Sequence, residues 1–200
     1  MKIIGITQRI DNYTSREELR EALDYRLPLI FNQLNLACVP ISSYSSKESL
    51  NQLFQLFGGF VLSGGNNIGE YPERDKLEKF ILEYSSIKNI PVLGICRGMQ
   101  FILNYEKFPL VKFKNHINLR HKIYFVDNKK FLEVNSFHNF GVLHSSIRDP
   151  VKSLAYSKDN CSEYIKHKLY PWTGIMWHPE REKKISDFDY SLINKIFNSK

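Results

Sequence analysis

Cys96 lies in the stretch Gly94-Ile95-Cys96-Arg97-Gly98, where an apolar strand is predicted to run directly into a helix. Glycines on both sides favour such a turn, because Cβ atoms there would collide with the adjoining strand and helix. The first free amides of the helix would face the sulfur and favour its thiolate form. The spacing therefore indicates a nucleophilic thiol. The alternative is a small buried core cysteine.

A base for this thiol is offered by Trp177-His178-Pro179-Glu180, which follows the last apolar strand. In an extended segment, residues two apart point the same way, so His178 and Glu180 can lie side by side. A cysteine nucleophile needs a base to move its proton, and the base needs an acceptor that orients it. The alternative is an ordinary solvated or core imidazole. Together with the elbow cysteine, the pattern favours a catalytic set of Cys96, His178 and Glu180.

The first half of the chain must position these residues, and its hydrophobic pattern alternates between strand and helix. Strands are predicted at residues 2–7, 37–41, 60–62 and just before Cys96. A capping box at Ser15 to Glu18 predicts a helix through Leu34, kinked near Asp24 by Pro28. Further helices are predicted through residues 50–57, 77–87 and 99–103. Four alternations indicate a mostly parallel sheet covered on both faces.

Beyond Tyr105 the pattern becomes strand-rich and predicts antiparallel additions to the sheet. The expected strands are residues 117–126, 131–134, 151–156, 164–167 and 174–177, followed by a closing helix over 188–197. With 200 residues and 42% hydrophobic content, the chain is expected to form one α/β domain over residues 1–200.

Composition also bounds location and partners. The sequence has no apolar stretch of eighteen residues, and residues 1–6 suggest a strand rather than a signal segment, so we expect a cytoplasmic protein without membrane association. Cys38 and Cys161 are predicted to be core thiols, because no C-x-x-C pair suggests a metal site or disulfide framework. His116 and His121 are interpreted as surface or strand residues, and no metal or cofactor is expected.

The net charge of +7 is concentrated in residues 107–130. That segment has one acidic residue, Asp127, against seven basic ones: Lys107, Lys112, Lys114, Arg120, Lys122, Lys129 and Lys130. Such a segment can attract an anionic ligand such as a nucleotide, attract nucleic acid, or form a solvated face. The segment carries no recognisable nucleic-acid motif.

Three motifs together resemble the class I glutamine amidotransferase family. They are the Ser63-Gly64-Gly65 loop, the Cys96 elbow through Gln100, and His178-Pro179-Glu180, which occur in the family's order across almost the whole chain. The resemblance implies a flavodoxin-like three-layer sandwich and a Cys-His-Glu triad that forms a glutamyl thioester and releases glutamate. It also implies an oxyanion hole made by the backbone amides of Gly65 and Arg97, with Gln100 helping to hold the glutamyl group.

Val134-Asn135-Ser136-Phe137-His138 resembles the family segment whose main chain binds the glutamyl α-amino and α-carboxylate groups, which gives Ser136, Phe137 and His138 as candidate substrate-binding residues. His138 could instead be an ordinary turn residue. The segment and the short single domain look closest to stand-alone γ-glutamyl hydrolases. This sequence departs from that group at three places: Asn139, the Gly65-Asn66-Asn67 sequence and the short stretch 103–111. These differences weaken the case for small-amine leaving groups.

The resemblance extends to γ-glutamyl hydrolysis in capsular phosphoramidate biosynthesis, which implies a substrate whose glutamyl group is joined to a nitrogen on phosphorus and products that are glutamate and cytidine diphosphoramidate. The small-molecule substrate is then an anionic nucleotide conjugate. Alternatives are a small-amine hydrolase, a glutaminase subunit that delivers ammonia to a separate synthase, and a silent module that binds nucleic acid. The presence of Cys96, His178 and Glu180 argues against the silent module, and a glutaminase subunit would require a separate synthase protein. We therefore expect a hydrolase with no obligate synthase partner and no nucleic-acid partner.

Overall fold

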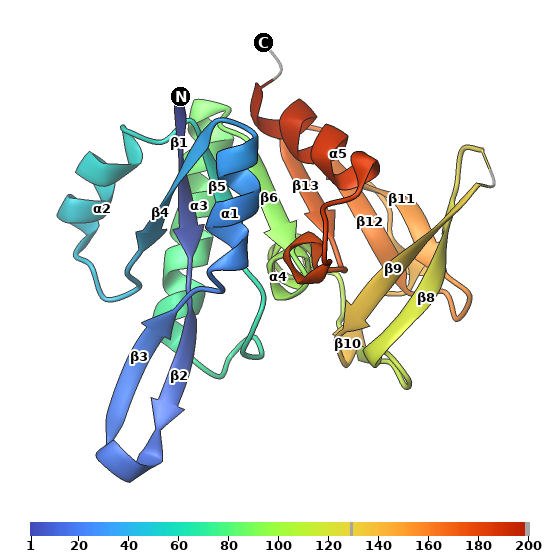
Figure 1. The fold of residues 1–200 in the computed structure, drawn as a ribbon, viewed down its shortest axis with the longest axis horizontal. Coiled ribbons are helices and arrows are strands. Elements are labelled where there is room, and N and C mark those ends of the chain that lie inside the picture. Colours follow the sequence, from blue (N-terminus) through green and yellow to red (C-terminus); the bar gives the residue numbers. More distant parts are fainter. Residues whose placement is uncertain (129, 199–200) are drawn as a thin grey trace.

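The computed structural model describes residues 1–128 and 130–198, and its main feature is a mixed sheet covered by helices on both faces (Figure 1). In the described residues this sheet has nine strands in the order β4-β1-β5-β6-β13-β12-β11-β8-β9. The first five run parallel and the last four are joined antiparallel. The predicted α/β class is confirmed, including the antiparallel additions.

The five parallel strands are β4 (Leu36–Ile41), β1 (Lys2–Thr7), β5 (Gly59–Leu62), β6 (Val92–Ile95) and β13 (Trp172–Ile175). The antiparallel strands are β12 (Ser162–His167), β11 (Val151–Ser157), β8 (Ile117–Phe125) and β9 (Phe131–Phe137). Residues of β5, β6 and β13 are buried throughout, as expected for central strands covered on both faces. Strand predictions in both halves are therefore largely confirmed.

Two hydrophobic clusters divide the helices between the faces of the sheet. On one face lie α1 (Arg26–Gln33) and α5 (Asp187–Asn198), whose rings Phe31 and Phe197 pack 5.7 Å apart. On the other lie α2 (Lys47–Phe54), α3 (Pro72–Lys88) and α4 (Arg97–Tyr105). This arrangement gives the three layers predicted from the sequence.

The helix predicted from Ser15 to Leu34 is confirmed only over α1, Arg26–Gln33, and is wrong before it. Residues 9–22 instead form a hairpin of β2 (Arg9–Tyr13) and β3 (Glu18–Ala22), which projects from the body in Figure 1. Its turn contains the short 3-10 helix η1 (Thr14–Arg16), and Glu17 adopts φ 51°. The side chain of Asn66 binds both the N–H and the carbonyl of Ile10 at 2.7 and 2.9 Å. A contact this distant in sequence fixes an extended strand that local periodicity cannot reveal.

Pro28 lies in the first turn of α1, where a backbone N–H has no intrahelical acceptor to lose. The predicted kink near Asp24 is therefore absent from α1. The remaining elements are the short pair β7 (Val111–Lys112) and β10 (Phe140–Gly141), and the 3-10 helices η2 (His144–Ser146) and η3 (Pro179–Arg181). Among the described residues, no helix is both long and apolar enough to cross a membrane.

Candidate active site

Three neighbouring strands deliver the predicted chemical groups to one edge of the sheet. β5 ends before Ser63-Gly64-Gly65, β6 ends before Cys96, and β13 ends shortly before His178. Because these strands are parallel neighbours, their carboxyl ends meet at the same edge, where α/β sheets bind ligands. Residues more than eighty positions apart are thereby brought together.

The turn at Cys96 is as sharp as the glycine spacing predicts. Cys96 has φ 53° and ψ −105°, a conformation that residues with side chains rarely adopt, and its N–H donates to the Ile175 carbonyl at 2.7 Å. A Cβ on Gly98 would lie 2.0 Å from the Leu62 carbonyl oxygen, and one on Gly94 would lie 2.6 Å from the Gly98 backbone. Only glycine permits this approach of α4 to β5 and β6, so the turn depends on both positions.

The predicted base and its acceptor are in contact. His178 Nδ1 and Glu180 Oε1 are 2.6 Å apart, and both side chains are buried. The other edge of the imidazole faces the elbow: the point where a Cβ on Gly64 would lie is 3.6 Å from His178 Nε2 and 3.7 Å from Cys96 Cβ. The structure thus brings Cys96, His178 and Glu180 together in the order thiol, imidazole, carboxylate.

The electrostatics of the pair favour the ionised thiol. Burial by itself would raise the pKa of Cys96, but the positive charge and hydrogen bond of His178, with a smaller contribution from the Arg97 N–H, hold that pKa below its usual value. Burial opposes the charge on His178, yet the facing thiolate and Glu180 raise the pKa of its ring to about 9. These opposite shifts describe a thiolate beside an imidazolium.

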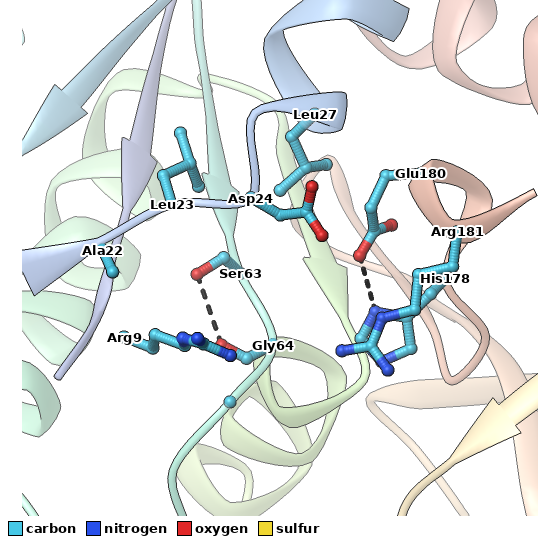
Figure 2. Close-up of a pocket in the computed structure, with 11 residues that line it drawn as sticks. Arg9, Ala22, Leu23, Asp24, Leu27, Ser63, Gly64, His178, Glu180 and Arg181 are labelled. Atoms are coloured by element: carbon cyan, nitrogen blue, oxygen red, sulfur yellow. Dashed lines mark hydrogen bonds and ion pairs between the residues drawn. The ribbon is translucent and has the colours of Figure 1, made fainter. Parts of the chain in front are cut away.

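A hollow of about 120 Å³ opens beside His178 and Glu180 (Figure 2), and Cys96 is not among the residues that line it. Its walls come from the 9–22 hairpin and the stretch that leads to α1, the glycine-rich loop, and the residues after β13: Arg9, Ala22, Leu23, Asp24, Leu27, Ser63, Gly64, Gly65, His178, Glu180 and Arg181. Gly65 has φ +93°, and a Cβ there would lie 2.8 Å from Cβ of Arg9. Among the residues that line the hollow, Arg9 and Arg181 carry positive charge.

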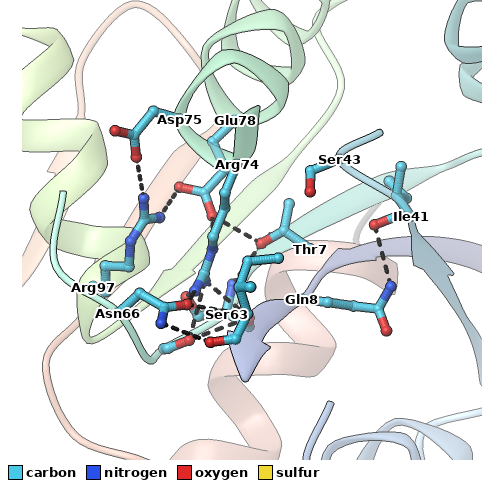
Figure 3. A network of polar contacts seen from close by, with 12 residues as sticks. Thr7, Gln8, Ile41, Ser43, Ser63, Asn66, Arg74, Asp75, Glu78 and Arg97 are labelled. Carbon is cyan, nitrogen blue, oxygen red and sulfur yellow. Dashed lines mark hydrogen bonds and ion pairs between the residues drawn. The ribbon is translucent and has the colours of Figure 1, made fainter. Parts of the chain in front are cut away.

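Beneath the glycine-rich loop lies a buried ionic network that the sequence did not indicate (Figure 3). Arg74 donates to the carbonyls of Ser63 and Gly64 at 2.7 and 3.0 Å and pairs with Glu78 at 3.1 Å. Glu78 and Asp75 in turn accept from the Arg97 side chain. Glu78 therefore links the loop that carries Gly65 to the first residue of α4. Only the (i, i+4) spacing of Arg74 and Glu78 hinted at a pair.

The end of β9 reaches the site from the far edge of the sheet. Asn135 holds the His178 main chain at both ends, accepting from its N–H at 2.9 Å and donating to its carbonyl at 2.8 Å. The ring of Phe137 lies edge-on to that of His178, with centroids 5.8 Å apart. The sequence indicated Asn135 only as part of a motif. In the structure its side chain holds the main chain of His178, the predicted base.

The other predicted substrate-binding residues gather beside Phe137. Gln100 donates to the Phe140 carbonyl at 2.7 Å, and His138 contacts the same oxygen through Nδ1 at 3.0 Å. Ser136 donates to the His116 carbonyl at 2.7 Å. His138 is buried, with 4% of its surface exposed, so it is not an ordinary turn residue.

Two predictions outside the triad need correction. His116 is buried outside the strands and its Nε2 lies 2.8 Å from Asp159, whereas the sequence suggested a surface or strand residue. His121, given the same prediction, is a half-buried residue of strand β8 and agrees with it. Cys161 is fully buried as predicted, while Cys38 is only partly so.

The basic segment 107–130 does not line the hollow beside His178. Lys114 and Lys122 instead border a separate surface hollow with His116 and His121. Arg120 is engaged by Glu133 and Glu182 at 3.1 and 2.7 Å. Lys129 lies outside the described residues.

The glutamine amidotransferase class-I family profile matches residues 10–198, which include every residue of the candidate site except Arg9. The chain belongs to the class I glutamine amidotransferase family. This chain is 36% identical over 206 aligned residues to the γ-glutamyl-CDP-amidate hydrolase of Campylobacter jejuni, with 96% of this chain and 99% of that relative covered. It is also 26% identical to anthranilate synthase component 2 of Cyanophora paradoxa, covering 86% of this chain and 88% of the relative.

Solved structures agree with the amidotransferase fold. A putative GMP synthase subunit from Thermoplasma acidophilum superposes with a TM-score of 0.72 over 99% of this chain and 93% of its own, at 23% identity. A glutamine amidotransferase from Thermotoga maritima gives 0.65 over 90% and 76%, at 17% identity. At these identities the likeness shows the fold of the amidotransferase and not its substrate.

Proposed function

We propose that this protein hydrolyses a γ-glutamyl amide through a thioester on Cys96 and that its substrate is γ-glutamyl-CDP-amidate. The observation that carries the proposal is the alignment of thiol, imidazole and carboxylate at the ends of β6 and β13. The 36% identity to a hydrolase of that substrate, over nearly the full length of both chains, supports the choice of substrate.

In the first half of the reaction, the Cys96 thiolate attacks the δ-carbonyl carbon of the glutamyl group and a C–S bond forms. The carbonyl oxygen becomes an oxyanion that accepts hydrogen bonds from the Gly65 and Arg97 amides; loss of one such donor typically costs about a hundredfold or more in rate. The C–N bond then breaks as His178 Nε2 gives its proton to the leaving nitrogen. The products at this stage are the glutamyl thioester on Cys96 and the released nitrogen compound, which no longer carries the glutamyl group.

In the second half, neutral His178 takes a proton from a water molecule, whose oxygen attacks the thioester carbonyl. The C–S bond breaks, glutamate leaves, and the thiolate again faces a protonated imidazole. Glu180 holds the ring through Nδ1 and stabilises its positive charge in both halves. Its role is to orient and stabilise His178 rather than to transfer a proton.

Recognition of the glutamyl group is assigned to Gln100 and the main chain of Ser136, Phe137 and His138. Support comes from their location: Phe137 contacts the His178 ring, and Gln100 and His138 share the Phe140 carbonyl. The contact between Phe137 and the His178 ring is what supports a role for this segment near the reacting groups.

The leaving group is assigned to a nucleoside diphosphate carried on nitrogen, released as cytidine diphosphoramidate for capsular phosphoramidate biosynthesis. Arg9 and Arg181 bring positive charge to the hollow beside His178, and Arg181 is held over the Phe137 ring at 4.2 Å. Guanidinium groups bind phosphate oxygens in a bidentate manner. We therefore expect these arginines, more than the 107–130 lysines, to meet the diphosphate.

The proposal is tested by measuring glutamate release from γ-glutamyl-CDP-amidate, glutamine and γ-glutamyl small amines. The nucleotide conjugate should react fastest, and Cys96→Ala should remove activity while circular dichroism remains unchanged. Cys38→Ala, at a partly buried thiol outside the hollow, is the matched control and should retain activity. Turnover near wild type in Cys96→Ala would refute the triad, and glutamine hydrolysis that appears only with a synthase would indicate an ammonia-delivering subunit instead.

A further inference from the structure

A second group of ionisable side chains lies buried behind the glutamyl-binding segment. It consists of His116 before β8, His138 after β9 and Glu163 on β12, whose side chains are at most 3% exposed. One nitrogen or oxygen from each lies within 4.8 Å of the others. None of these side chains has a part in the proposed hydrolysis.

Hydrogen bonds fix which ring nitrogens face inward. His116 Nε2 lies 2.8 Å from the Asp159 carboxylate, and His138 Nδ1 lies 3.0 Å from the Phe140 carbonyl. Both partners are acceptors, so both nitrogens carry the proton of a neutral imidazole. His116 Nδ1 and His138 Nε2 therefore present lone pairs to each other across 3.1 Å.

Glu163 adds a third acceptor at the same point. Its Oε1 lies 3.5 Å from His138 Nε2 and 3.8 Å from His116 Nδ1, and within the described residues it accepts no hydrogen bond. Three electron-pair donors that converge in a buried space require a cation between them. That cation is either a proton on one ring or a metal ion.

The distances and the outer hydrogen bonds together fit a metal ion. In a tetrahedral zinc site with bonds of about 2.0–2.1 Å, neighbouring ligand atoms are about 3.3 Å apart, close to the separations of 3.1, 3.5 and 3.8 Å seen here. Zinc-binding histidines also donate their other N–H to a carboxylate or backbone carbonyl, as His116 and His138 do. A set of two nitrogens and one oxygen suits Zn²⁺ better than Mg²⁺ or Ca²⁺, which prefer oxygen ligands.

We propose that His116, His138 and Glu163 bind one Zn²⁺ ion. His121 is not one of these three converging donors: its Nε2 lies 3.5 Å from the same Glu163 oxygen and is without a hydrogen-bond partner among the described residues. The ion joins the loop before β8, the end of β9 and β12. It thereby fixes the segment whose Asn135 holds His178, and it takes no part in bond making. The site exists whether or not the proposed hydrolysis is correct.

The test is zinc binding by the purified full chain without substrate. Metal content is measured by mass spectrometry, and the chelator-treated protein is titrated with Zn²⁺ against a chromophoric competitor. We expect one ion per chain, and visible absorption bands of a tetrahedral centre when Co²⁺ replaces it. His116→Ala and Glu163→Gln should weaken binding by at least about a hundredfold. His144→Ala, a partly buried histidine bonded to Ser153 instead, should bind as wild type.

Asp159→Asn provides a variant that leaves the three proposed ligands unchanged, and its side chain is 46% exposed. It should fold normally and lose about tenfold in zinc affinity, because the Asp159 carboxylate orients the His116 ring. Failure of the folded wild-type chain to bind Zn²⁺ at tens of micromolar would overturn the proposal and assign the cation to a ring proton. Unchanged affinity in folded Glu163→Gln would also overturn it.

Discussion

Cys96 combines an unfavourable backbone with a favourable electrostatic environment. Residues held at such positive φ typically cost about 1–3 kcal/mol, which surrounding packing must offset. Here Gly94 and Gly98 admit the close approach of α4 that offsets it. The same geometry directs the sulfur away from the strand and toward the His178 ring. A thiol that sits there is more acidic than the other two in the chain.

Selective alkylation tests this acidity. Iodoacetamide at pH 6.5 should label Cys96 well before Cys38 and Cys161, because only thiolates react and burial raises the pKa of Cys38 to about 12 and that of Cys161 further. Labelling is followed by peptide mass spectrometry. In His178→Ala, Cys96 should lose its advantage at this pH, since the positive charge that stabilises the thiolate is gone. Equal labelling of all three thiols in wild type would contradict the assignment.

The pH dependence of turnover follows from His178. Its raised pKa, about 9, means that the ring is protonated across neutral pH and loses its proton as pH rises through that region. The leaving nitrogen then has no proton donor, so kcat/KM for glutamate release should fall above about pH 9. The same ion pair stabilises the fold below that range and ceases to do so above it.

Glu180→Gln removes one cause of the raised pKa of His178, so the fall in kcat/KM should move to lower pH. The profile is recorded with a substrate whose own groups do not titrate between pH 7 and 10. If the pH profile of kcat/KM does not shift in Glu180→Gln, the Glu180 carboxylate does not influence the pKa of His178.

At the scale of elements, the site depends on a sheet that curls. β9 is four strands away from β13, which in a flat sheet would be about 19 Å. Asn135 nevertheless contacts the His178 main chain at 2.8 and 2.9 Å. The antiparallel half of the sheet therefore bends back over the carboxyl edge of the parallel half.

Removing this clamp should cost both stability and rate. Asn135→Ala leaves the buried N–H and carbonyl of His178 without their partner, at about 1–3 kcal/mol for each such group. Free energy of unfolding and kcat should both decrease, with kcat lower by about tenfold or more because the base loses its fixed position. Ser153→Ala, at another buried polar residue, should lower stability only. If Asn135→Ala and Ser153→Ala had equal kcat, Asn135 would not position His178 for the reaction.

The 9–22 hairpin is expected to act on the leaving group. Arg9→Gln removes positive charge beside Gly64 and Gly65 and should raise KM for the nucleotide conjugate by about tenfold, while leaving KM for glutamine nearly unchanged. Arg20→Gln is the matched control, because Arg20 is on the same hairpin and pairs with Glu18 as Arg9 pairs with Asp11, but it does not line the hollow. Similar changes for both substrates would show that Arg9 does not meet the diphosphate.

Sequence reasoning succeeded where chemistry and position coincide in a short motif. Three short motifs predict their own local geometry: the elbow, the His178-Pro179-Glu180 run and the glycine-rich loop. Parallel strands then bring them together. It failed where contacts are long-range: Asn66 selects a hairpin over a helix, Arg74 reaches back to Ser63, and Glu163 meets His116 from another strand. Nothing local in these stretches encodes such pairings.

At the scale of the whole molecule, α4 must lie directly on β5 and β6. Gly98→Ala would place a methyl group 2.0 Å from the Leu62 carbonyl, a backbone atom that cannot move aside. We expect a loss of about 3 kcal/mol or more and a Tm lower by roughly 6 °C or more, measured by calorimetry. Gly69→Ala is the control: its φ of +87° costs about 1 kcal/mol, and a Cβ there would meet no atom of the described residues beyond its chain neighbours within 4 Å. Equal losses would show that the close approach is not limiting.

Glu78 is the shared partner of Arg74 and Arg97 and so ties together the supports of the two amides assigned to the oxyanion. The consequence concerns how this enzyme can change over evolution or in design. The positions of the two amides cannot change independently, because a substitution at either Arg74 or Arg97 also alters the contact of Glu78 with the other arginine. Variants with altered acyl chemistry are therefore expected to carry compensating exchanges at Arg74, Glu78 and Arg97, whereas the hairpin that faces the leaving group is free to diversify.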